Sequence, residues 1–487
     1  MKSVTLRARR RDEIFHLDTS RVVTKPFIPG GPDRCRNVIN RVLRLSDTEV
    51  ADVLEELRLN FEGRHKNIWE AFREHFELVQ HFVEQDQPLS DHRRLLIGAY
   101  FTHEFSIEAA AFFNPSIVPH PDQSGLQPGD LRFVMSFRAT GEGHLSSIEF
   151  RSGVLKHDHA IEFDPISRYV GRANIVKNPK YVVRDFMRKL DEMGWKNEVS
   201  DTILSALAAE FTYTELERAI TESYSQSQDG WASAEETSDN MRWLARSNYD
   251  IWFRREDSLS ERVIFPVSKN ESRGIEDARF VRFVDDDGDI TYYATCTAYN
   301  GFTILPQLIV TQDFLHFRMI TLNGKSSKDK GMALFPRKIN GRYVMISRID
   351  GENMYLMTSD NVHFWDEVTC LQAPSDPWEF IQIGNCGSPI ETSEGWLLLT
   401  HGVGPMRQYC MGAMLLDLET PHRVIGKMKD PLLVSNQKER EGYVPNVVYS
   451  CGALIHNGEL VIPYATSDWA STIAQVEVGE LLDLLKS

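Results

Sequence analysis

The segment Asn340-Gly-Arg-Tyr-Val-Met-Ile-Ser347 joins a glycine turn to an apolar, strand-like run, and three other segments repeat it. A glycine allows the positive φ that a tight turn ahead of a strand requires. The four turn glycines are 53, 54 and 63 residues apart, a step that is typical of a four-stranded propeller blade. Unrelated hairpins in a β-sandwich are the alternative. The other three segments are Asp287-Gly-Asp-Ile-Thr-Tyr-Tyr-Ala294, Glu394-Gly-Trp-Leu-Leu-Leu-Thr-His401 and Asn457-Gly-Glu-Leu-Val-Ile-Pro-Tyr464.

These four units predict a mainly β protein. A fifth unit from the strand-like runs around 131–164 and 250–284 would complete a five-bladed β-propeller. We expect this catalytic domain to span 126–487, with a helical insertion at about 178–248, after a helical N-terminal region over 1–125. Residues 33–112 carry apolar side chains at helical spacing, including a capping-box pattern of Ser46 with Glu49.

Composition excludes several classes of partner. The 487 residues carry a formal net charge of -16, which disfavours a nucleic-acid backbone or an anionic membrane as the main partner. No apolar run of about 18 residues is present, so we expect no membrane span and a cytoplasmic location. The six cysteines form no CxxC pair, which predicts free thiols in a reducing compartment and no metal site.

The first candidate for chemistry is the stretch Ser272-Arg-Gly-Ile-Glu-Asp-Ala-Arg-Phe280, which places two carboxylates between two arginines ahead of a strand. A solvated salt-bridge cluster is the simpler interpretation of such a motif alone. In a propeller, however, polar residues at the inner strand ends converge on one funnel, and later repeats supply matching residues. Paired carboxylates in such a funnel suit glycoside cleavage. These residues are Asp277, Arg348, Asp350, His401 and Asp468.

Residues 250–478 resemble glycoside hydrolase family 130, the β-mannoside phosphorylases and mannosidases, which are five-bladed β-propellers. Several blocks carry this resemblance in order along the chain: Gly274-Ile-Glu-Asp-Ala-Arg279, Thr297-Ala-Tyr-Asn-Gly301, Ala333-Leu-Phe-Pro-Arg-Lys-Ile-Asn-Gly-Arg-Tyr343, Gly395-Trp-Leu-Leu-Leu-Thr-His-Gly-Val403, Leu415-Leu-Asp-Leu-Glu-Thr-Pro421, Val444-Pro-Asn-Val-Val-Tyr-Ser-Cys-Gly452 and Tyr464-Ala-Thr-Ser-Asp468.

The resemblance implies roles for individual residues. Asp277 matches the family's general acid, which protonates the glycosidic oxygen through a sugar hydroxyl. Three positions depart from the family pattern. Ala278 replaces the proline after the acid, and at the proposed phosphate site Gln382 replaces a lysine and Lys330 an arginine. The residues expected to bind phosphate or position water are Arg348, His401, Tyr409, Lys330 and Gln382. Those expected to bind the sugar are Glu276, Arg279, Asn300, Asp350 and Asp468.

The resemblance therefore implies an inverting enzyme that cleaves β-mannosides or related β-glycosides in disaccharides or oligosaccharides. Phosphorolysis is favoured because the funnel keeps most of its basic residues, although neutral Gln382 removes one charge. Hydrolysis by the same fold and a non-catalytic carbohydrate-binding propeller or scaffold are the alternatives. We expect no cofactor and no metal, inorganic phosphate as co-substrate, and homo-oligomers formed through the N-terminal helices.

Overall fold

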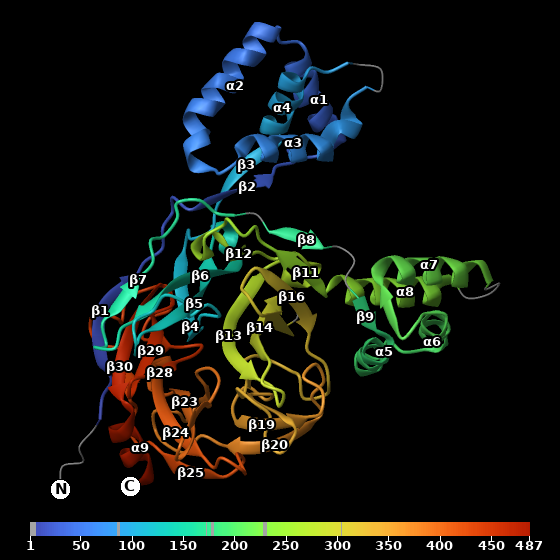
Figure 1. Cartoon of the computed structure of the whole chain (residues 1–487). Coiled ribbons are helices and arrows are strands. Elements are labelled where there is room, and N and C mark those ends of the chain that lie inside the picture. Colours follow the sequence, from blue (N-terminus) through green and yellow to red (C-terminus); the bar gives the residue numbers. More distant parts are fainter. Residues whose placement is uncertain (1–5, 85–87, 172, 177–179, 227–230, 303) are drawn as a thin grey trace.

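The computed structural model describes residues 6–84, 88–171, 173–176, 180–226, 231–302 and 304–487 (Figure 1). Strands predominate: these residues form thirty strands and nine α-helices, so the expectation of a mainly β protein is confirmed. Among these residues, no helix combines the length and the apolar character that a bilayer crossing requires. All six cysteines are free thiols; Cys370 is exposed and the other five are buried.

The largest sheet runs in the order β4-β5-β6-β13-β14-β15-β16-β11-β8. Two hairpin series meet in it, where Gly274 of β13 pairs in parallel with Ser146 of β6. The strands β7 and β12 pair with β6. Their bounds are β4 Ala111–Pro119, β5 Leu131–Thr140, β6 Ser146–Leu155, β7 Ile161–Phe163, β8 Asn174–Val176, β11 Tyr249–Trp252, β12 Val263–Ile264, β13 Gly274–Val284, β14 Ile290–Tyr299, β15 Ile304–Thr311 and β16 His316–Thr321.

Three smaller sheets follow along the chain. The first contains β17 Ala333–Leu334, β18 Tyr343–Ser347, β19 Met354–Ser359 and β20 Glu367–Gln372. The second contains β21 Gln382–Asn385, β22 Ile390–Thr392, β23 Gly395–Val403, β24 Tyr409–Leu416, β25 Val424–Lys427 and β26 Leu433–Val434. The third contains β27 Val448–Tyr449, β28 Leu454–His456, β29 Glu459–Thr466, β30 Ala470–Glu477 and the N-terminal strand β1 Arg9–Phe15.

The four repeated turns each begin a strand in a different sheet. Gly288 precedes β14, Gly341 precedes β18, Gly395 begins β23 and Gly458 precedes β29. All four glycines have positive φ, between 76° and 152°. The repeat found in the sequence therefore marks equivalent turns in four separate sheets.

Two helical groups lie outside the sheets (Figure 1). The first joins the sheets through the paired strands β2 Val22–Pro26 and β3 Thr102–Ser106. The second follows β8 and includes the pair β9 Lys180–Val182 and β10 Glu210–Thr212. Helix α9, Val478–Lys486, ends the chain. The first group is α1 Pro32–Leu43, α2 Asp47–Phe61, α3 Ile68–Val79 and α4 Asp91–Tyr100, and the second is α5 Val183–Glu192, α6 Glu198–Ser205, α7 Tyr213–Gln226 and α8 Trp231–Arg246.

The N-terminal region departs from the expectation that residues 1–125 are helical. The helices end at Tyr100, and β1, β2, β3 and β4 also lie in this range. Strand β1 escapes detection because its sequence, RRRDEIF, is mostly charged and its order comes from backbone pairing with β30. Strand β4 contains Pro115 and Pro119, although proline is depleted in strands. Pro115 lies at a register shift of this strand, where a proline is tolerated.

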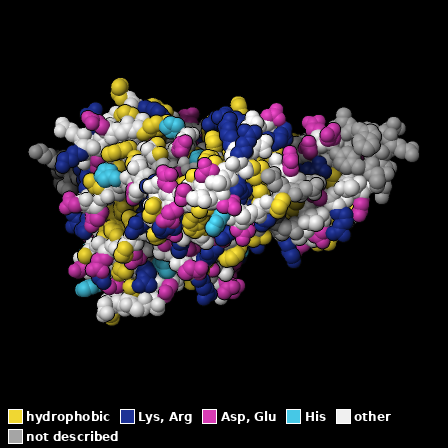
Figure 2. All heavy atoms as spheres, turned by 90° about the horizontal axis from the view of Figure 1, so that it is seen from above, with side chains coloured by type: hydrophobic (Ala, Val, Ile, Leu, Met, Phe, Trp, Pro, Cys, Tyr) yellow, Lys and Arg dark blue, Asp and Glu magenta, His cyan; other side chains and the backbone are white. Residues whose placement is uncertain are grey.

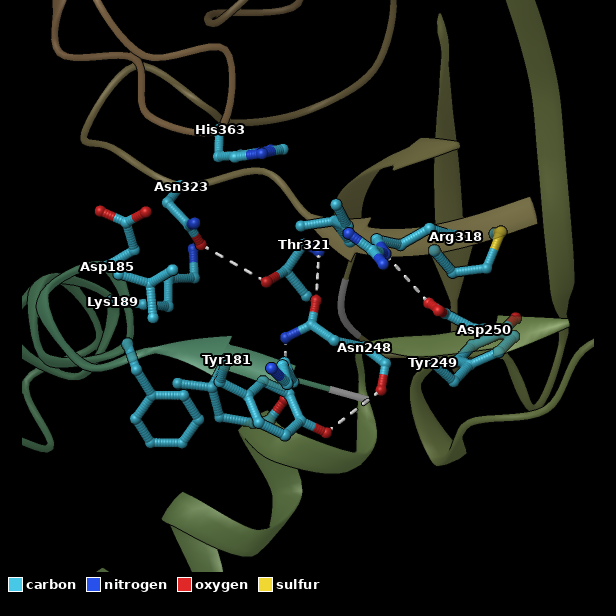
Figure 3. A pocket seen from close by; sticks show the side chains of 16 residues that line it. Tyr181, Asp185, Lys189, Asn248, Tyr249, Asp250, Arg318, Thr321, Asn323 and His363 are labelled. Atoms are coloured by element: carbon cyan, nitrogen blue, oxygen red, sulfur yellow. Dashed lines mark hydrogen bonds and ion pairs between the residues drawn. The ribbon is translucent and has the colours of Figure 1, made fainter. Parts of the chain in front are cut away.

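The second helical group, residues 180–246, is anchored on the edge of the largest sheet (Figure 3). The backbone N–H of Thr321 donates to Asn248 Oδ1 at 2.7 Å, and Tyr181 donates its hydroxyl to the carbonyl of Ala245 at 2.7 Å. Lys189 reaches the carbonyl of Leu322 at 3.3 Å. These buried contacts fix the helices relative to the strands.

Candidate functional site

Asp277 and Asn114 lie at irregularities of neighbouring hairpins and contact each other. The register of β13 shifts between Glu276 and Arg279, and that of β4 shifts between Phe113 and Ser116. Both residues have left-handed φ, 55° for Asp277 and 50° for Asn114, which Asp and Asn adopt more readily than most side chains. Asn114 Nδ2 donates to Asp277 Oδ1 at 2.7 Å. The two bulges thus aim a carboxylate and an amide at one point.

Glu276 is held by two cations. Its Oε1 accepts from Arg138 Nη2 at 2.7 Å, and its Oε2 accepts from Lys330 Nζ at 2.6 Å. Arg138 also approaches Asp277 Oδ1, with Nη1 at 3.4 Å. Both oxygens of Glu276 are therefore occupied by the protein itself. Among the described residues, the hydrogen bonds of the Asp277 side chain all reach Oδ1, which leaves Oδ2 open to a ligand.

The charge environment keeps Asp277 ionised. Burial raises the pKa of this carboxyl, but the positive charges of Arg138, Arg279 and Lys330 and the hydrogen bond from Asn114 outweigh burial and lower it. In the free protein, Asp277 is therefore a carboxylate at neutral pH.

Tyr449 connects Asp277 to a second polar group. Arg279 donates through Nη1 to the carbonyl of Asp277 at 3.1 Å and through Nη2 to the Tyr449 hydroxyl at 2.5 Å. The ring of Tyr449 packs edge-on against His401, with centroids 4.9 Å apart. A continuous path of contacts thus runs from Asp277 to His401.

His401 is buried among neutral and cationic partners. Its Nδ1 lies 3.0 Å from the carbonyl of Asn385, so Nδ1 donates and Nε2 is left as an acceptor. Nε2 lies 3.3 Å from both Arg348 Nη1 and Gln382 Nε2. Burial, assisted by the charge of Arg348, lowers the pKa of His401 to about 3. The imidazole is therefore neutral and is a weak base.

Asp468 is influenced by Arg138, as Asp277 is, but its pKa is shifted in the opposite direction from that of Asp277. It has a left-handed φ of 51° in the turn between β29 and β30. Burial and the negative charge of Asp277 raise the pKa of Asp468 to about 6, against the opposing charges of Arg138 and Arg407. Two neighbouring carboxyls thus have pKa values that are displaced in opposite directions, which is a common feature of sites for acid–base chemistry.

The structure separates three of the expected residues from direct contact with Asp277. Tyr409 stacks beside His401, with ring centroids 6.0 Å apart. Asp350 is exposed, and both of its oxygens accept hydrogen bonds from its own turn, from the backbone of Glu352 and Asn353 and from the side chains of Asn353 and Tyr355. Asp350 therefore organises a loop, and its expected role in sugar binding has no geometric support. Asn300 lines a cleft beside the second helical group.

Sequence reasoning missed Asn114, Arg138 and Tyr449. Arg138 lies within the strand-like runs around 131–164, and Tyr449 lies inside one of the blocks that carry the family resemblance. The positions of Arg138 and Tyr449 in these segments could therefore have marked them as candidate site residues. Nothing in the sequence shows that Asn114 has left-handed φ or that it faces Asp277 from 163 positions away.

Comparisons with known proteins agree with the resemblance. The model of the glycoside hydrolase family 130, described as beta-1,4-mannooligosaccharide phosphorylase, matches residues 244–487. The 1,2-beta-oligomannan phosphorylase of Thermoanaerobacter sp. (strain X514) is 32% identical over 252 residues, covering 49% of this chain and 81% of the relative. The beta-1,4-mannooligosaccharide phosphorylase of Ruminococcus albus is 31% identical over 249 residues, covering 47% and 72%.

Solved structures match this chain at lower sequence identity. The complex of the beta-1,2-mannobiose phosphorylase from Listeria innocua with beta-1,2-mannobiose is 20% identical to this chain, with a TM-score of 0.45. The alignment covers 78% of this chain and 93% of that structure.

Proposed function

Because this chain belongs to glycoside hydrolase family 130, we propose that it cleaves β-mannosides with inversion and transfers the mannosyl group to inorganic phosphate. The observation that carries this proposal is the path of contacts Asp277–Arg279–Tyr449–His401. It joins a carboxylate suited to proton transfer with a group of donors suited to an anion.

The anion-binding part has unused donors. Nε of Arg348 and Nε of Arg279 are buried, and within the described residues neither has a hydrogen-bond acceptor. Asp329 Oδ2 is the carboxylate nearest to Arg348 Nε, at 4.0 Å, which is beyond hydrogen-bond distance. Buried donors without partners are costly, and a phosphate oxygen would satisfy them.

Proton transfer is assigned to Asp277. A sugar hydroxyl bonded to Oδ2 of Asp277 would pass its proton to the glycosidic oxygen and receive one from the carboxyl. The bond from the anomeric carbon to that oxygen breaks, and a phosphate oxygen attacks the carbon from the opposite face. A bound phosphate anion would offset the cations that lower the pKa of Asp277, which helps the carboxyl to carry the required proton.

Hydrolysis fits this geometry less well. A water molecule would need a general base on the side of attack. His401 is neutral and, with a pKa of about 3, too weak a base to activate water near neutral pH. Phosphate is already a nucleophile and needs no such base.

The arrangement of sheets supports further proposals about the architecture. The five hairpin series that begin with β4, β13, β17, β21 and β27 would be the blades of a five-bladed propeller, with residues of the site contributed by all five. We propose an N-terminal unit, a propeller whose first series begins with β4 at Ala111 and not at about residue 126, and a helical insertion at about 178–248. Exposed apolar residues on α2 and α3, Leu59 and Leu78, support self-association through the N-terminal helices.

A panel of β-mannosides incubated with and without phosphate tests the proposal. We expect mannose 1-phosphate only when phosphate is present. Release of free mannose at the same rate without phosphate would assign hydrolysis instead. Binding of oligosaccharides without turnover of any glycoside would favour a non-catalytic binding protein.

A further inference from the structure

A cleft of about 1070 Å³ lies between the second helical group and residues that flank the start of β13, the strand that carries Asp277. One wall comes from the α5–α6 connection, the start of α7 and helix α8, and the other from residues 267–270 and Asn300. We call it the insertion cleft. Its volume is that of a pocket for a sizeable ligand.

Asn300 of the insertion cleft lies beside the start of β13, the strand that carries Asp277. Asn300 follows Tyr299, which pairs with Gly274, and Asp277 lies three residues further along β13. At the usual rise of a strand, Asp277 is roughly 10 Å from this pair. Lys330, which binds Glu276, also lies 6.0 Å from the ring centroid of Tyr299. A chain whose scissile bond lay at Asp277 would therefore reach the cleft only beyond the sugar ring that adjoins this bond.

The lining of the cleft combines aromatic surfaces with fixed polar groups. Trp195 and Trp243 pack edge to face with centroids 5.2 Å apart, and both are partly exposed. Arg242 is held on both oxygens of Glu217 at 3.1 Å and on Asp239 at 3.1 Å, so its charge is largely compensated. Arg246, which donates to the Tyr213 hydroxyl, and Lys269 also line the cleft. Aromatic faces beside such hydrogen-bond donors suit a hydroxyl-rich chain.

The cleft is preformed. Asn248 and Tyr181, which line it, also hold the helices on the sheet edge (Figure 3). Asn270 donates to the hydroxyl of Ser247 and ties the opposite wall to the end of α8. A rigid site binds a ligand with a smaller entropic cost. Most of the helical wall precedes residue 244, where the family match begins.

We propose that the insertion cleft binds the distal sugars of a β-mannooligosaccharide whose scissile bond lies at Asp277. This inference rests on the proposed function and adds that chains longer than a disaccharide are preferred. Figure 2 shows both basic and acidic side chains on the face of the molecule that it draws.

The test compares kcat/KM for mannobiose and mannotetraose, each β-1,2- and β-1,4-linked. Trp243→Ala is expected to lower the tetraose-to-biose ratio about tenfold, as truncation of a contact worth about 1.4 kcal/mol does. Because Trp243 also packs in the helical group, Asn240→Ala provides a second variant that removes only a polar contact. Trp252→Ala changes a tryptophan that is 45% exposed on β11 and does not line the cleft, and it should leave the ratio unaltered.

A binding measurement separates this inference from the proposed function. Mannotetraose is titrated calorimetrically into Asp277→Asn without phosphate, with and without Trp243→Ala. Weaker binding when Trp243 is truncated supports the cleft even if the wild-type protein turns over no mannoside. An unaltered ratio in both cleft variants, or binding that does not depend on Trp243, overturns the inference while phosphorolysis of mannobiose can still hold. Tighter binding of an acidic oligosaccharide than of mannotetraose would also contradict it.

Discussion

Single residues of the site depend on backbone positions as much as on side-chain chemistry. Asp277 and Asn114 face each other because both occupy left-handed φ at a bulge. Such positions cost about 1–3 kcal/mol each and persist where the surrounding structure enforces them. Replacing Asp277 by Asn keeps a residue type that tolerates this backbone, so it tests the chemistry without disturbing the bulge.

Gln382 offers a test of the phosphate site. We expect Gln382→Lys to lower the KM for phosphate about tenfold, because a charge-assisted bond contributes about 1.5–3 kcal/mol. Initial rates at varied phosphate concentration measure this effect. Gln382→Glu is the matched control, which should raise the same KM. Equal phosphate dependence in both variants would place the anion elsewhere.

The raised pKa of Asp468 predicts that the free energy of unfolding depends on pH. Its pKa is about 6 in the folded protein and about 3.9 in an unfolded chain, so the folded state binds this proton more tightly. The stabilising contribution is present below about pH 4 and is lost as pH rises through about 6. Asp468→Asn should therefore raise the free energy of unfolding by about 3 kcal/mol at pH 8 and change it little at pH 4. Denaturant titrations at the two pH values check this; an equal effect at both would contradict the assignment.

At this scale the sequence predicts residue identities better than residue geometry. Asp277, Arg348, His401 and Gln382 were predicted, and the structure links them. Asp350 ends a repeat as the others do, but its own turn takes up its carboxylate. Periodicity alone does not distinguish a residue that binds a ligand from one that caps a loop.

Among the elements, the connection before β2 is fixed by a buried ion-pair cluster. Arg21 contacts Glu108 at 2.8 Å and Glu149 at 2.9 Å, and all three side chains are fully buried. Arg151 binds both glutamates as well. This cluster connects the segment ahead of the N-terminal helices with β6 of the largest sheet.

Removal of one partner from this cluster should be costly. Arg21→Ala leaves two buried carboxylates with a single arginine, and we expect a loss of about 3–5 kcal/mol in the free energy of unfolding. Arg36→Ala removes an exposed pair with Asp33 and should change stability by less than about 1 kcal/mol. Chemical denaturation of both variants measures these losses in the free energy of unfolding. Equal losses would show that the buried cluster does not anchor the segment.

Helices and turns could be predicted from the sequence where nearby residues determine them. The Ser46–Glu49 capping box forms as expected, and the four repeated turn glycines have positive φ. Strand β1 was not predictable, because a charged edge strand depends on a partner 450 or more residues away for its order. The boundary of the strand region was misplaced for the same reason, since β4 is ordered by pairing with β5.

Across the whole molecule, the two ends of the chain meet in one sheet, where β1 pairs with β30. Phe15 at the end of β1 packs against Phe137 and Phe163, with centroids 5.2 and 5.0 Å away. Deleting residues 2–16 would expose the edge of β30 and this apolar contact. We expect a lower Tm and a tendency to aggregate, measured by calorimetry and light scattering. Ile14→Ala, which truncates a side chain that is 59% exposed, is the control and should leave the Tm nearly unaltered.

The central claim is that Asp277 and the linked anion site carry out inverting phosphorolysis. The most direct measurement is a ³¹P NMR time course of the full chain with β-mannobiose in phosphate buffer, beside the Asp277→Asn variant. The account predicts α-mannose 1-phosphate from the wild-type protein, and a rate 10² to 10⁴ times lower, as is typical for loss of a general acid, from a variant with unaltered Tm. Free mannose without a new phosphorus signal, or equal rates in both proteins, would contradict it.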